Sequence, residues 1–225
     1  FMNNAYNAHI LFLKSIFFIL AACLLLSCED NQADGNIYEE VTNYANDDII
    51  NMWGIDFSIK NTKVIDLRKN QIPGAMEIPS KISKLKNLTQ LNLSWNKLKG
   101  EIPSEIGLLT NLIILNLEGN QIEGEIPQSI AKLTLLENLN LSWNKLSGSV
   151  PSNISYLTNL KSLSFAYNDL NGEIPDLICD LNINFDKNWC DDHSSYEFIE
   201  NNKFCPPYPN CIVSSIGQQD LSNCN

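Results

Sequence analysis

Residues 85–106 read LKNLTQLNLSWNKLKGEIPSEI, and the chain repeats the pattern of this stretch every 24 residues. The proline column comprises Pro79, Pro103, Pro127, Pro151 and Pro175. The asparagine column comprises Asn96, Asn120, Asn144 and Asn168, and the glycine column comprises Gly100, Gly124, Gly148 and Gly172. Self-similarity at such a period predicts a solenoid, in which each unit buries its apolar side against its neighbours.

Each recurring position of the unit has a physical role. Leu91 and Leu93 alternate along a short strand and point into the core. Asn96 turns inward after the strand, where its amide can satisfy backbone groups of the turn and of neighbouring coils. Gly100 permits a tight backbone conformation. Pro103 predicts that the return segment starts in an extended conformation, because proline disfavours helix in the residue before it.

The unit resembles the leucine-rich repeat, in the 24-residue form that is typical of plant receptor ectodomains. The resemblance implies an α/β repeat solenoid, a horseshoe with parallel strands on its concave face. We expect the repeats to occupy residues 61–178, beginning with an irregular unit. A last irregular repeat is expected to follow, because residues 199–204 match residues 93–98 after an insertion.

Residues 28–60 are expected to form an N-terminal linker and a capping helix. Apolar residues fall at helical spacing between residues 37 and 52. The sequence Met52-Trp53-Gly54-Ile55 resembles the Trp-Gly-Val element that leads into the first strand of plant-type repeat proteins. The cysteine pair that usually surrounds this element is absent, so we expect this cap to be held by packing alone.

Residues 179–225 are expected to form the last irregular repeat and a cysteine-rich cap. Five of the seven cysteines lie here, which indicates an oxidising compartment. The segment from Cys205 to Cys224 resembles the closing segment of bacterial surface proteins with plant-like repeats. That resemblance implies two disulfides and one odd cysteine, with the pairing left open by the sequence. The bridged residues would be Cys179, Cys205, Cys211 and Cys224, and the odd one Cys190.

Residues 1–27 are expected to be a lipoprotein signal peptide. Lys14 precedes an apolar run of about a dozen residues, the pattern of a secretory signal. This run is shorter than the roughly 20 residues that a membrane-spanning helix needs. The sequence Leu25-Leu26-Ser27-Cys28 resembles the lipobox, which implies that Cys28 is lipidated and anchors an exported protein at the surface of the outer membrane. The sequence Leu20-Ala21-Ala22-Cys23 also resembles a lipobox, so Cys23 is the alternative.

The composition argues against several classes of function. A net charge of -11 disfavours nucleic-acid binding, because an acidic chain repels phosphate groups. Without the leader, His193 is the one histidine, which disfavours a histidine base and a multi-histidine metal site. The chain contains no phosphate loop and no nucleophile motif. We therefore expect no enzymatic activity, no cofactor and no metal.

Candidate binding residues lie between the core leucines, where the fold implied by the resemblance exposes them on the concave face. They combine amides, charged groups and aromatic rings. The candidates are Arg68, Gln90, Asn92, Trp95, Asn116, Glu118, Asn140, Trp143 and Tyr167. Tryptophan and tyrosine dominate binding hot spots and also stack on sugar rings. The alternative is that these aromatic residues only pack along the edge of the solenoid.

Three further motifs have structural explanations beside the functional ones. Residues 180–191 place oxygen ligands at calcium-loop spacing, but Phe185 stands where the loop requires glycine, and a cap strand explains the pattern as well. Residues 190–193, Cys-Asp-Asp-His, are expected to form a solvated loop rather than a metal site. Four Asn-x-Ser/Thr sequences would accept glycans only in a eukaryotic source. They begin at Asn87, Asn92, Asn140 and Asn153.

Two functional hypotheses follow from these observations. The first is a surface-anchored recognition or adhesion module, without catalysis, that binds a protein or a glycan on its concave face. The second is a structural or inhibitory protein, for example an inhibitor of polysaccharide-degrading enzymes, as some plant-type members of this fold are. Loss of a partner upon concave substitutions would favour the first hypothesis, and inhibition of a glycosidase would favour the second.

Overall fold

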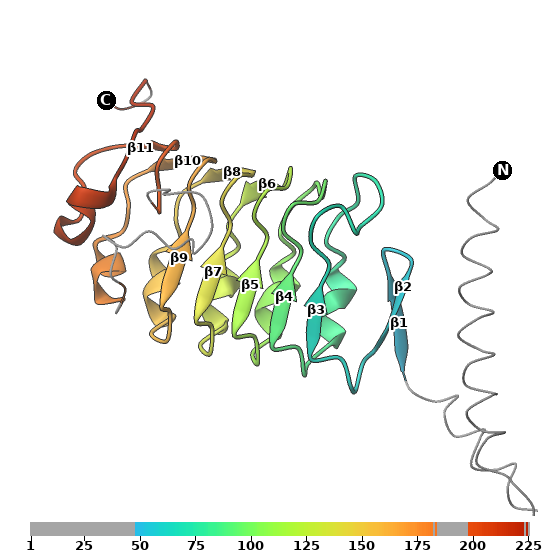
Figure 1. The fold of residues 1–225 in the computed structure, drawn as a ribbon. Helices are drawn as coiled ribbons and strands as arrows, with labels where there is room; N and C mark the ends of the chain where they lie inside the picture. Colours follow the sequence, from blue (N-terminus) through green and yellow to red (C-terminus); the bar gives the residue numbers. More distant parts are fainter. Residues whose placement is uncertain (1–47, 182, 184–197, 223, 225) are drawn as a thin grey trace, which may run out of the picture. The chain divides into compact units, whose positions relative to one another are not determined.

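The computed structural model describes residues 48–181, 183, 198–222 and 224. All of these residues belong to one compact unit of the chain. Figure 1 shows its strands and short helices side by side, one repeat after another. Within these ranges, no helix has the length and apolar character needed to cross a membrane.

One side of the solenoid is a parallel sheet of five strands. In order across the sheet, these are β3 (Val64–Asp66), β4 (Gln90–Asn92), β5 (Ile114–Asn116), β7 (Asn138–Asn140) and β9 (Ser162–Ser164). The register places each residue beside its counterpart in the next repeat, as Leu91 lies beside Leu115. The middle residue of every strand is buried in the core. The predicted parallel strands and their inward leucines are confirmed.

A second parallel sheet runs along another side of the coils, and the sequence analysis did not predict it. Its strands are β6 (Glu123–Glu125), β8 (Lys145–Gly148), β10 (Asp169–Gly172) and β11 (Lys203–Phe204), paired in this order. Glycine is required in this sheet because Gly124 has a φ of 78°. A Cβ atom at Gly124 would also lie 2.8 Å from Cγ of Glu101 in the preceding coil. The glycine column therefore serves both the backbone conformation and the close packing of adjacent coils.

The return segment of each coil contains a short 3-10 helix that begins directly after the proline. These helices are η2 (Ser80–Lys84), η3 (Ser104–Leu108), η4 (Gln128–Lys132), η5 (Ser152–Tyr156), η6 (Asp176–Asp180) and, in the cap, η7 (Asn210–Ser215). Pro103 is extended, with a φ of -64° and a ψ of 138°. Every helix among the described residues is of this type, so the helical part of the expected α/β solenoid is 3-10. Coils pack closely here, since a Cβ at Gly107 would lie 2.3 Å from the Ser129 carbonyl oxygen.

The asparagine column forms a hydrogen-bond ladder inside the solenoid, as predicted. Asn168 Oδ1 accepts a hydrogen bond from Leu146 N over 3.0 Å. Its Nδ2 donates to the carbonyl oxygens of Leu141, Phe165 and Ala166, over 3.0, 2.9 and 3.2 Å. The same pattern recurs at Asn96, Asn120, Asn144 and Asn202. The ladder satisfies backbone groups that the strand pairing leaves open inside each coil.

The N-terminal end of the described chain is a hairpin. The prediction of a capping helix over residues 37–52 is therefore wrong for residues 49–52, which form a strand. β1 (Ile49–Met52) pairs antiparallel with β2 (Ile55–Ser58). Trp53 and Gly54 form the turn with φ angles of 55° and 80°, and positive φ at both positions suits a two-residue hairpin. Burial alternates along β1, which is the period of a strand. The rest of the expected helix lies outside the described residues.

Two disulfides hold the C-terminal end. Cys179, in η6, is bonded to Cys211, in η7, and Cys205, directly after β11, is bonded to Cys224. The four cysteines that the resemblance singled out are therefore confirmed as bridged. Cys190 lies outside the described residues.

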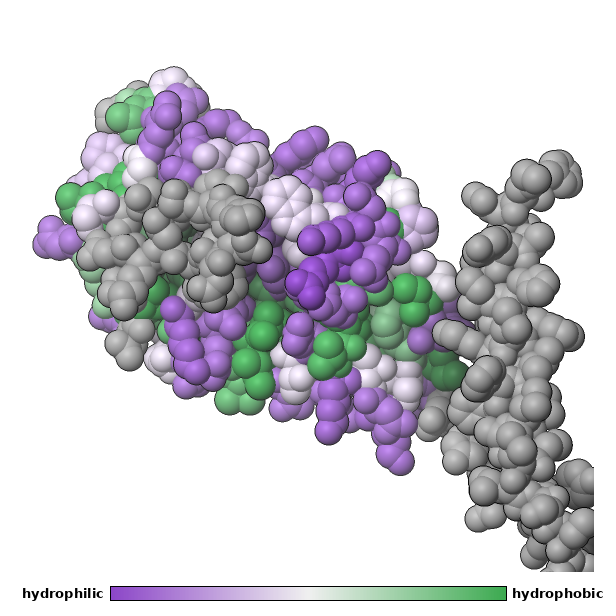
Figure 2. Space-filling model, in the orientation of Figure 1, coloured by the Kyte–Doolittle hydropathy of each residue, from purple (hydrophilic) through white to green (hydrophobic). Residues whose placement is uncertain are grey.

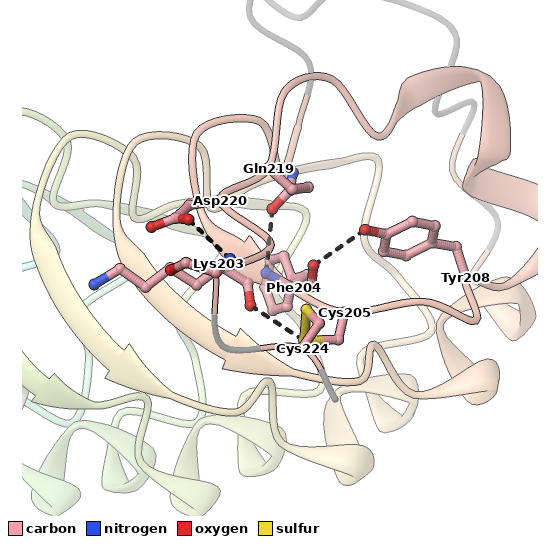
Figure 3. The surroundings of a disulfide bond; sticks show 8 residues. Lys203, Phe204, Cys205, Tyr208, Gln219, Asp220 and Cys224 are labelled. Atoms are coloured by element: carbon pink, nitrogen blue, oxygen red, sulfur yellow. Dashed lines mark hydrogen bonds between the residues drawn. A yellow bond between two sulfur atoms is a disulfide. The ribbon is translucent and has the colours of Figure 1, made fainter.

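Gln219 ends the internal ladder at the cap, in the place that asparagine has in the coils. Its Oε1 accepts a hydrogen bond from Phe204 N over 3.3 Å. Its Nε2 donates to the carbonyl oxygens of Ile199 and Ile216, over 2.9 and 2.8 Å. Figure 3 shows Gln219 above Phe204, near the Cys205–Cys224 disulfide. The expected match of residues 199–204 to a repeat is confirmed, since β11 continues the second sheet and Asn202 continues the ladder.

Candidate binding face

The predicted binding residues occupy equivalent places in successive coils, so the five-stranded sheet brings them into rows. Gln90, Asn92, Asn116 and Asn140 lie in β4, β5 and β7. Arg68 and Glu118 follow their strands by two residues, and Trp95, Trp143 and Tyr167 follow theirs by three. On the face of the molecule seen in Figure 2, hydrophobic residues are interspersed among hydrophilic ones. We call the rows of outward side chains on this sheet and in the turns after it the concave face.

The asparagines of the concave face hold the turns that follow the strands. Asn92 Oδ1 accepts hydrogen bonds from Ser94 N and Ser94 Oγ, over 3.1 and 2.8 Å. Asn140 Oδ1 accepts the equivalent pair from Ser142, and Asn116 Oδ1 accepts one from Glu118 N over 3.0 Å. Each bond runs from a donor in the residue two positions further on to the asparagine side chain and closes a local turn, which asparagine forms readily. The amide oxygens of this row are therefore engaged within the protein.

The aromatic row contains two different arrangements. Trp143 and Tyr167 stack on each other, with ring centroids 4.0 Å apart and planes 11° apart. Trp95 has no aromatic neighbour in the next coil, because Gly119 stands there. A Cβ at Gly119 would lie only 2.7 Å from the Trp95 ring, so this ring rests on the glycine backbone. Trp95 is 45% exposed. Packing along the edge thus explains Trp143 and Tyr167, whereas Trp95 presents an indole to solvent.

Glu118 is a half-buried acid within this face. Burial raises the pKa of its carboxyl group above the ordinary value of 4.5, and the hydrogen bond from Asn140 partly offsets that rise. Asn140 Nδ2 donates this bond to Glu118 Oε2 over 3.1 Å. The residues equivalent to Glu118 in the adjacent coils, Ser94 and Ser142, are buried and neutral. Sequence reasoning placed Glu118 on the face but could not show that its carboxylate is partly desolvated.

The two ends of the concave face differ from its middle. At the N-terminal end, Arg68 and Asp66 form a two-pronged ion pair, with both N–O distances 3.0 Å. At the other end, Ser162 and Ala166 are buried, being 3% and 0% exposed. In the middle of the face, Asn92, Ser94, Asn140 and Ser142 are also buried, being at most 9% exposed. The accessible side chains there include Trp95, Glu118 and the half-buried Gln90 and Asn116.

A groove at the C-terminal cap is another hollow in the surface, and the sequence did not predict it. It encloses about 630 Å³ and is lined by Asn168, Asn201, Asn202, Lys203, Gln218, Gln219, Asp220 and Leu221. Lys203 Nζ lies 2.5 Å from Asp169 Oδ1, and this hydrogen bond raises the pKa of Lys203. Ser222 N donates to Asp220, which lowers the pKa of that carboxyl group. Lys203 is already paired, and the amides of Asn168, Asn202 and Gln219 belong to the ladder, so these lining residues contribute to the stability of the cap. Figure 3 shows Lys203, Gln219 and Asp220 at this place.

The other residues around the cap are also engaged in structure. Tyr208 Oη donates a hydrogen bond to the Phe204 carbonyl oxygen over 3.0 Å, and burial raises the pKa of its phenol. Most of the calcium-like run at residues 180–191, the cluster at 190–193 and the lipidation candidates Cys23 and Cys28 lie outside the described residues. Among the residues that are described, no group of three or more His, Cys, Asp or Glu side chains is arranged to hold a metal ion.

Comparison with known proteins identifies the fold family. The family model described as "Leucine-rich repeat region" matches residues 54–183. The chain is similar to the BIR2 ectodomain from Arabidopsis thaliana, with 34% identity and a TM-score of 0.52 over 64% of this chain and 70% of that one. It is also similar to a chain of the Arabidopsis thaliana BIR3–SERK2 complex, with 37% identity and a TM-score of 0.53. This likeness covers 65% of this chain and 72% of that one.

More distant likeness extends over a larger part of the chain. Pollen Receptor Kinase 3 is 23% identical with a TM-score of 0.56 over 84% of each chain, which supports the fold alone. No curated protein matches the sequence. The disulfides and the ectodomain neighbours together indicate an exported protein. With a family model that covers more than half of its length and a solenoid built from the same 24-residue unit, the chain belongs to the leucine-rich repeat family.

Proposed function

We propose that this protein is an exported recognition module that binds a protein or peptide partner on its concave face, without catalysis. The observation that carries the proposal is Trp95, an indole that is 45% exposed and rests on Gly119. Large aromatic residues on a rigid surface are the usual anchors of protein interfaces. A preformed surface also loses little conformational entropy when it binds.

Solved relatives support a protein or peptide partner. The BIR3–SERK2 structure is, by its title, a complex. The ectodomain of the Arabidopsis thaliana receptor kinase GASSHO1/SCHENGEN3 was solved in complex with CASPARIAN STRIP INTEGRITY FACTOR 2. It is 30% identical to this chain with a TM-score of 0.50, and the likeness spans 64% of this chain but 19% of the receptor. Because these similar ectodomains were solved in complexes, partner binding is the first candidate role for this chain.

Capture of partners on matched protein surfaces tests this proposal. Full-length wild type, Trp95→Ala and Tyr156→Ala would each be immobilised and exposed to surface and secreted proteins of the source organism. Tyr156 is the matched control, because it is an aromatic residue 66% exposed on η5, away from the sheet. We expect a partner that wild type and Tyr156→Ala retain and that Trp95→Ala loses by at least about tenfold in affinity.

Circular dichroism would first establish that all three proteins are folded. A partner retained equally by all three would place the contact away from Trp95 and contradict the proposal. Retention of polysaccharides with no protein would redirect it to a glycan-binding role.

We also propose that the exported protein is held at a membrane surface through lipid on Cys28, in the manner of bacterial outer-membrane lipoproteins. The support is the sequence of residues 25–28, followed by Glu29 and Asp30. Several acyl chains on one cysteine anchor a protein stably, because each buried CH₂ contributes about 0.8 kcal/mol. Cys28→Ser is expected to move the protein from the membrane fraction to the soluble fraction, while Cys23→Ser leaves it in the membrane. The reverse result would assign the anchor to Cys23.

A further inference from the structure

Glu118 is the one charged side chain in the middle of the concave face. The other side chains of its outward rows in the coils of β4, β5, β7 and β9 are neutral amides, hydroxyls or apolar groups. They are Gln90, Asn92, Ser94, Ile114, Asn116, Asn138, Asn140, Ser142, Ser162, Ser164 and Ala166. In the part of the chain that the structure describes, the ion pairs are Arg68–Asp66, Lys161–Glu137 and Lys203–Asp169, and none includes Glu118.

The carboxylate of Glu118 is held in place by neutral groups. Asn140 Nδ2 donates to Oε2 over 3.1 Å. The backbone N of Glu118 is bonded to Asn116 Oδ1 over 3.0 Å, which fixes the turn that carries the side chain. A half-buried carboxylate that is oriented by an amide but lacks a counter-charge is preorganised to receive a cation, because partly buried charges gain most from being paired.

Trp95 lies beside this acid. Its backbone N donates to the Glu118 carbonyl oxygen over 2.7 Å, and its ring rests on Gly119, the residue that follows Glu118. The indole is 45% exposed. A guanidinium or ammonium group gains from the face of a tryptophan ring as well as from a carboxylate, and a guanidinium can stack on the ring while its N–H groups reach an acid.

The basic residues of the concave face, Arg68 and Lys69, both belong to the first coil and form no ion pair with Glu118. Arg68 is two coils away and is already paired in a two-pronged arrangement with Asp66 of its own coil. The charge at Glu118 is therefore left for a group from outside the chain.

We propose that the concave face recognises its partner through one arginine or lysine side chain, which pairs with the Glu118 carboxylate and packs its stem or guanidinium plane against Trp95. This inference rests on the proposed function and names the chemistry of the partner. A basic peptide fits this site better than a neutral sugar. The hydroxyl groups of a sugar would cover Trp95, but they would remove water from Glu118 without neutralising its charge.

Synthetic peptide pools test the inference directly. Four pools of dodecapeptides would carry Arg, Lys, Gln or Glu at one fixed central position and mixed residues elsewhere. Full-length wild type is expected to retain the Arg and Lys pools at least about tenfold more tightly than the Gln pool, and to reject the Glu pool. Glu118→Gln is expected to abolish the preference for Arg and Lys, and Trp95→Ala to reduce it. Glu123→Gln is the matched control, because Glu123 is an exposed acid in β6 on the other sheet.

Glu118→Gln separates the loss of charge from a loss of structure. Glutamine keeps an oxygen that can accept the bond from Asn140. Because burial raises the pKa of Glu118 in the folded state, the folded protein binds this proton more tightly than the unfolded chain does. Wild type therefore loses stability as the pH rises from 4.5, the pKa of Glu118 in the unfolded chain, through its raised pKa in the folded protein. The glutamine variant should melt no lower than wild type at pH 7, and its advantage should vanish below pH 4.5.

The possible outcomes separate this inference from the proposed function. Equal retention of the Arg and Gln pools overturns the inference but leaves peptide binding intact. Retention of the Arg pool by folded Glu118→Gln overturns the role of Glu118. Binding of neutral glycans on an array, with no peptide pool retained, overturns the basic partner and leaves the concave face as a glycan site. Retention of neither class, by a protein that melts cooperatively, overturns both proposals.

Discussion

Asn168→Ala is expected to lower the free energy of unfolding by about 1–3 kcal/mol, because a buried group that loses its only partner costs that much. The side chain is 8% exposed. Its removal would leave Leu146 N without its partner. The carbonyl oxygens of Leu141, Phe165 and Ala166 would keep the bonds that they accept from Asn144 Nδ2, Asn202 Nδ2 and Trp143 N. Denaturant unfolding followed by circular dichroism measures the change.

The matched control is Asn171→Ala in the same repeat. Asn171 is exposed in β10, so its replacement should change the stability by no more than about 0.5 kcal/mol. A loss below about 1 kcal/mol for Asn168→Ala would mean that water enters the coil and satisfies the freed groups. That result would contradict an asparagine ladder from which water is excluded. The equivalent substitution Asn144→Ala should give a similar loss, since Asn144 makes the same set of bonds one coil earlier.

The part of the fold that the sequence predicts is the part set by side chains of one coil and its nearest neighbours. Leu91 and Asn96 recur at one step, and the step itself determines that Leu91 lies beside Leu115. In a solenoid each coil contacts only adjacent coils, so a short unit contains the information for the whole stack. Prediction therefore succeeded for the parallel strands, the inward asparagines and the extended proline segments.

The features that the sequence did not predict depend on backbone pairing. In the second sheet, the segments Glu123–Glu125 and Lys145–Gly148 show no alternation of apolar residues, because they are held by main-chain hydrogen bonds between coils. At the N-terminal end, Ile49 and Met52 are spaced as on a helix, but Met52 pairs with Ile55 across the tight turn at Trp53 and Gly54. Such a short apolar pattern fits both kinds of element.

The candidate site was predicted in its position but not in its internal contacts. The 24-residue step placed Trp95, Trp143 and Tyr167 in one row with Gly119. It could not show that Trp143 stacks on Tyr167 while Trp95 covers Gly119, because ring orientation depends on the space left by each neighbour. Likewise, the bond from Asn140 to Glu118 joins side chains in two different rows of adjacent coils.

Removal of the disulfide between η6 and η7 is the other change with a large expected effect. The double substitution Cys179→Ser and Cys211→Ser opens a link between residues 32 positions apart in the sequence. The chain-entropy relation for such a loop gives a loss of about 3–4 kcal/mol in the free energy of unfolding. The loss should appear first at the cap, because a solenoid without its terminal cover exposes the core of its last coil. Here that core includes Ile178 and Ile212, both 0% exposed.

Hydrogen exchange and denaturant unfolding together test this expectation. The amide of Ile212, which donates to the Pro209 carbonyl oxygen over 3.1 Å, should lose protection in the variant, while the amide of Leu117 in the middle of the solenoid keeps it. The control is Cys205→Ser with Cys224→Ser, which opens a separation of 19 residues. By loop length it should cost only about 0.5 kcal/mol less than the first pair. If opening the Cys179–Cys211 link leaves stability and Ile212 protection unchanged, packing of the cap alone holds it in place, and the disulfide is dispensable for the fold.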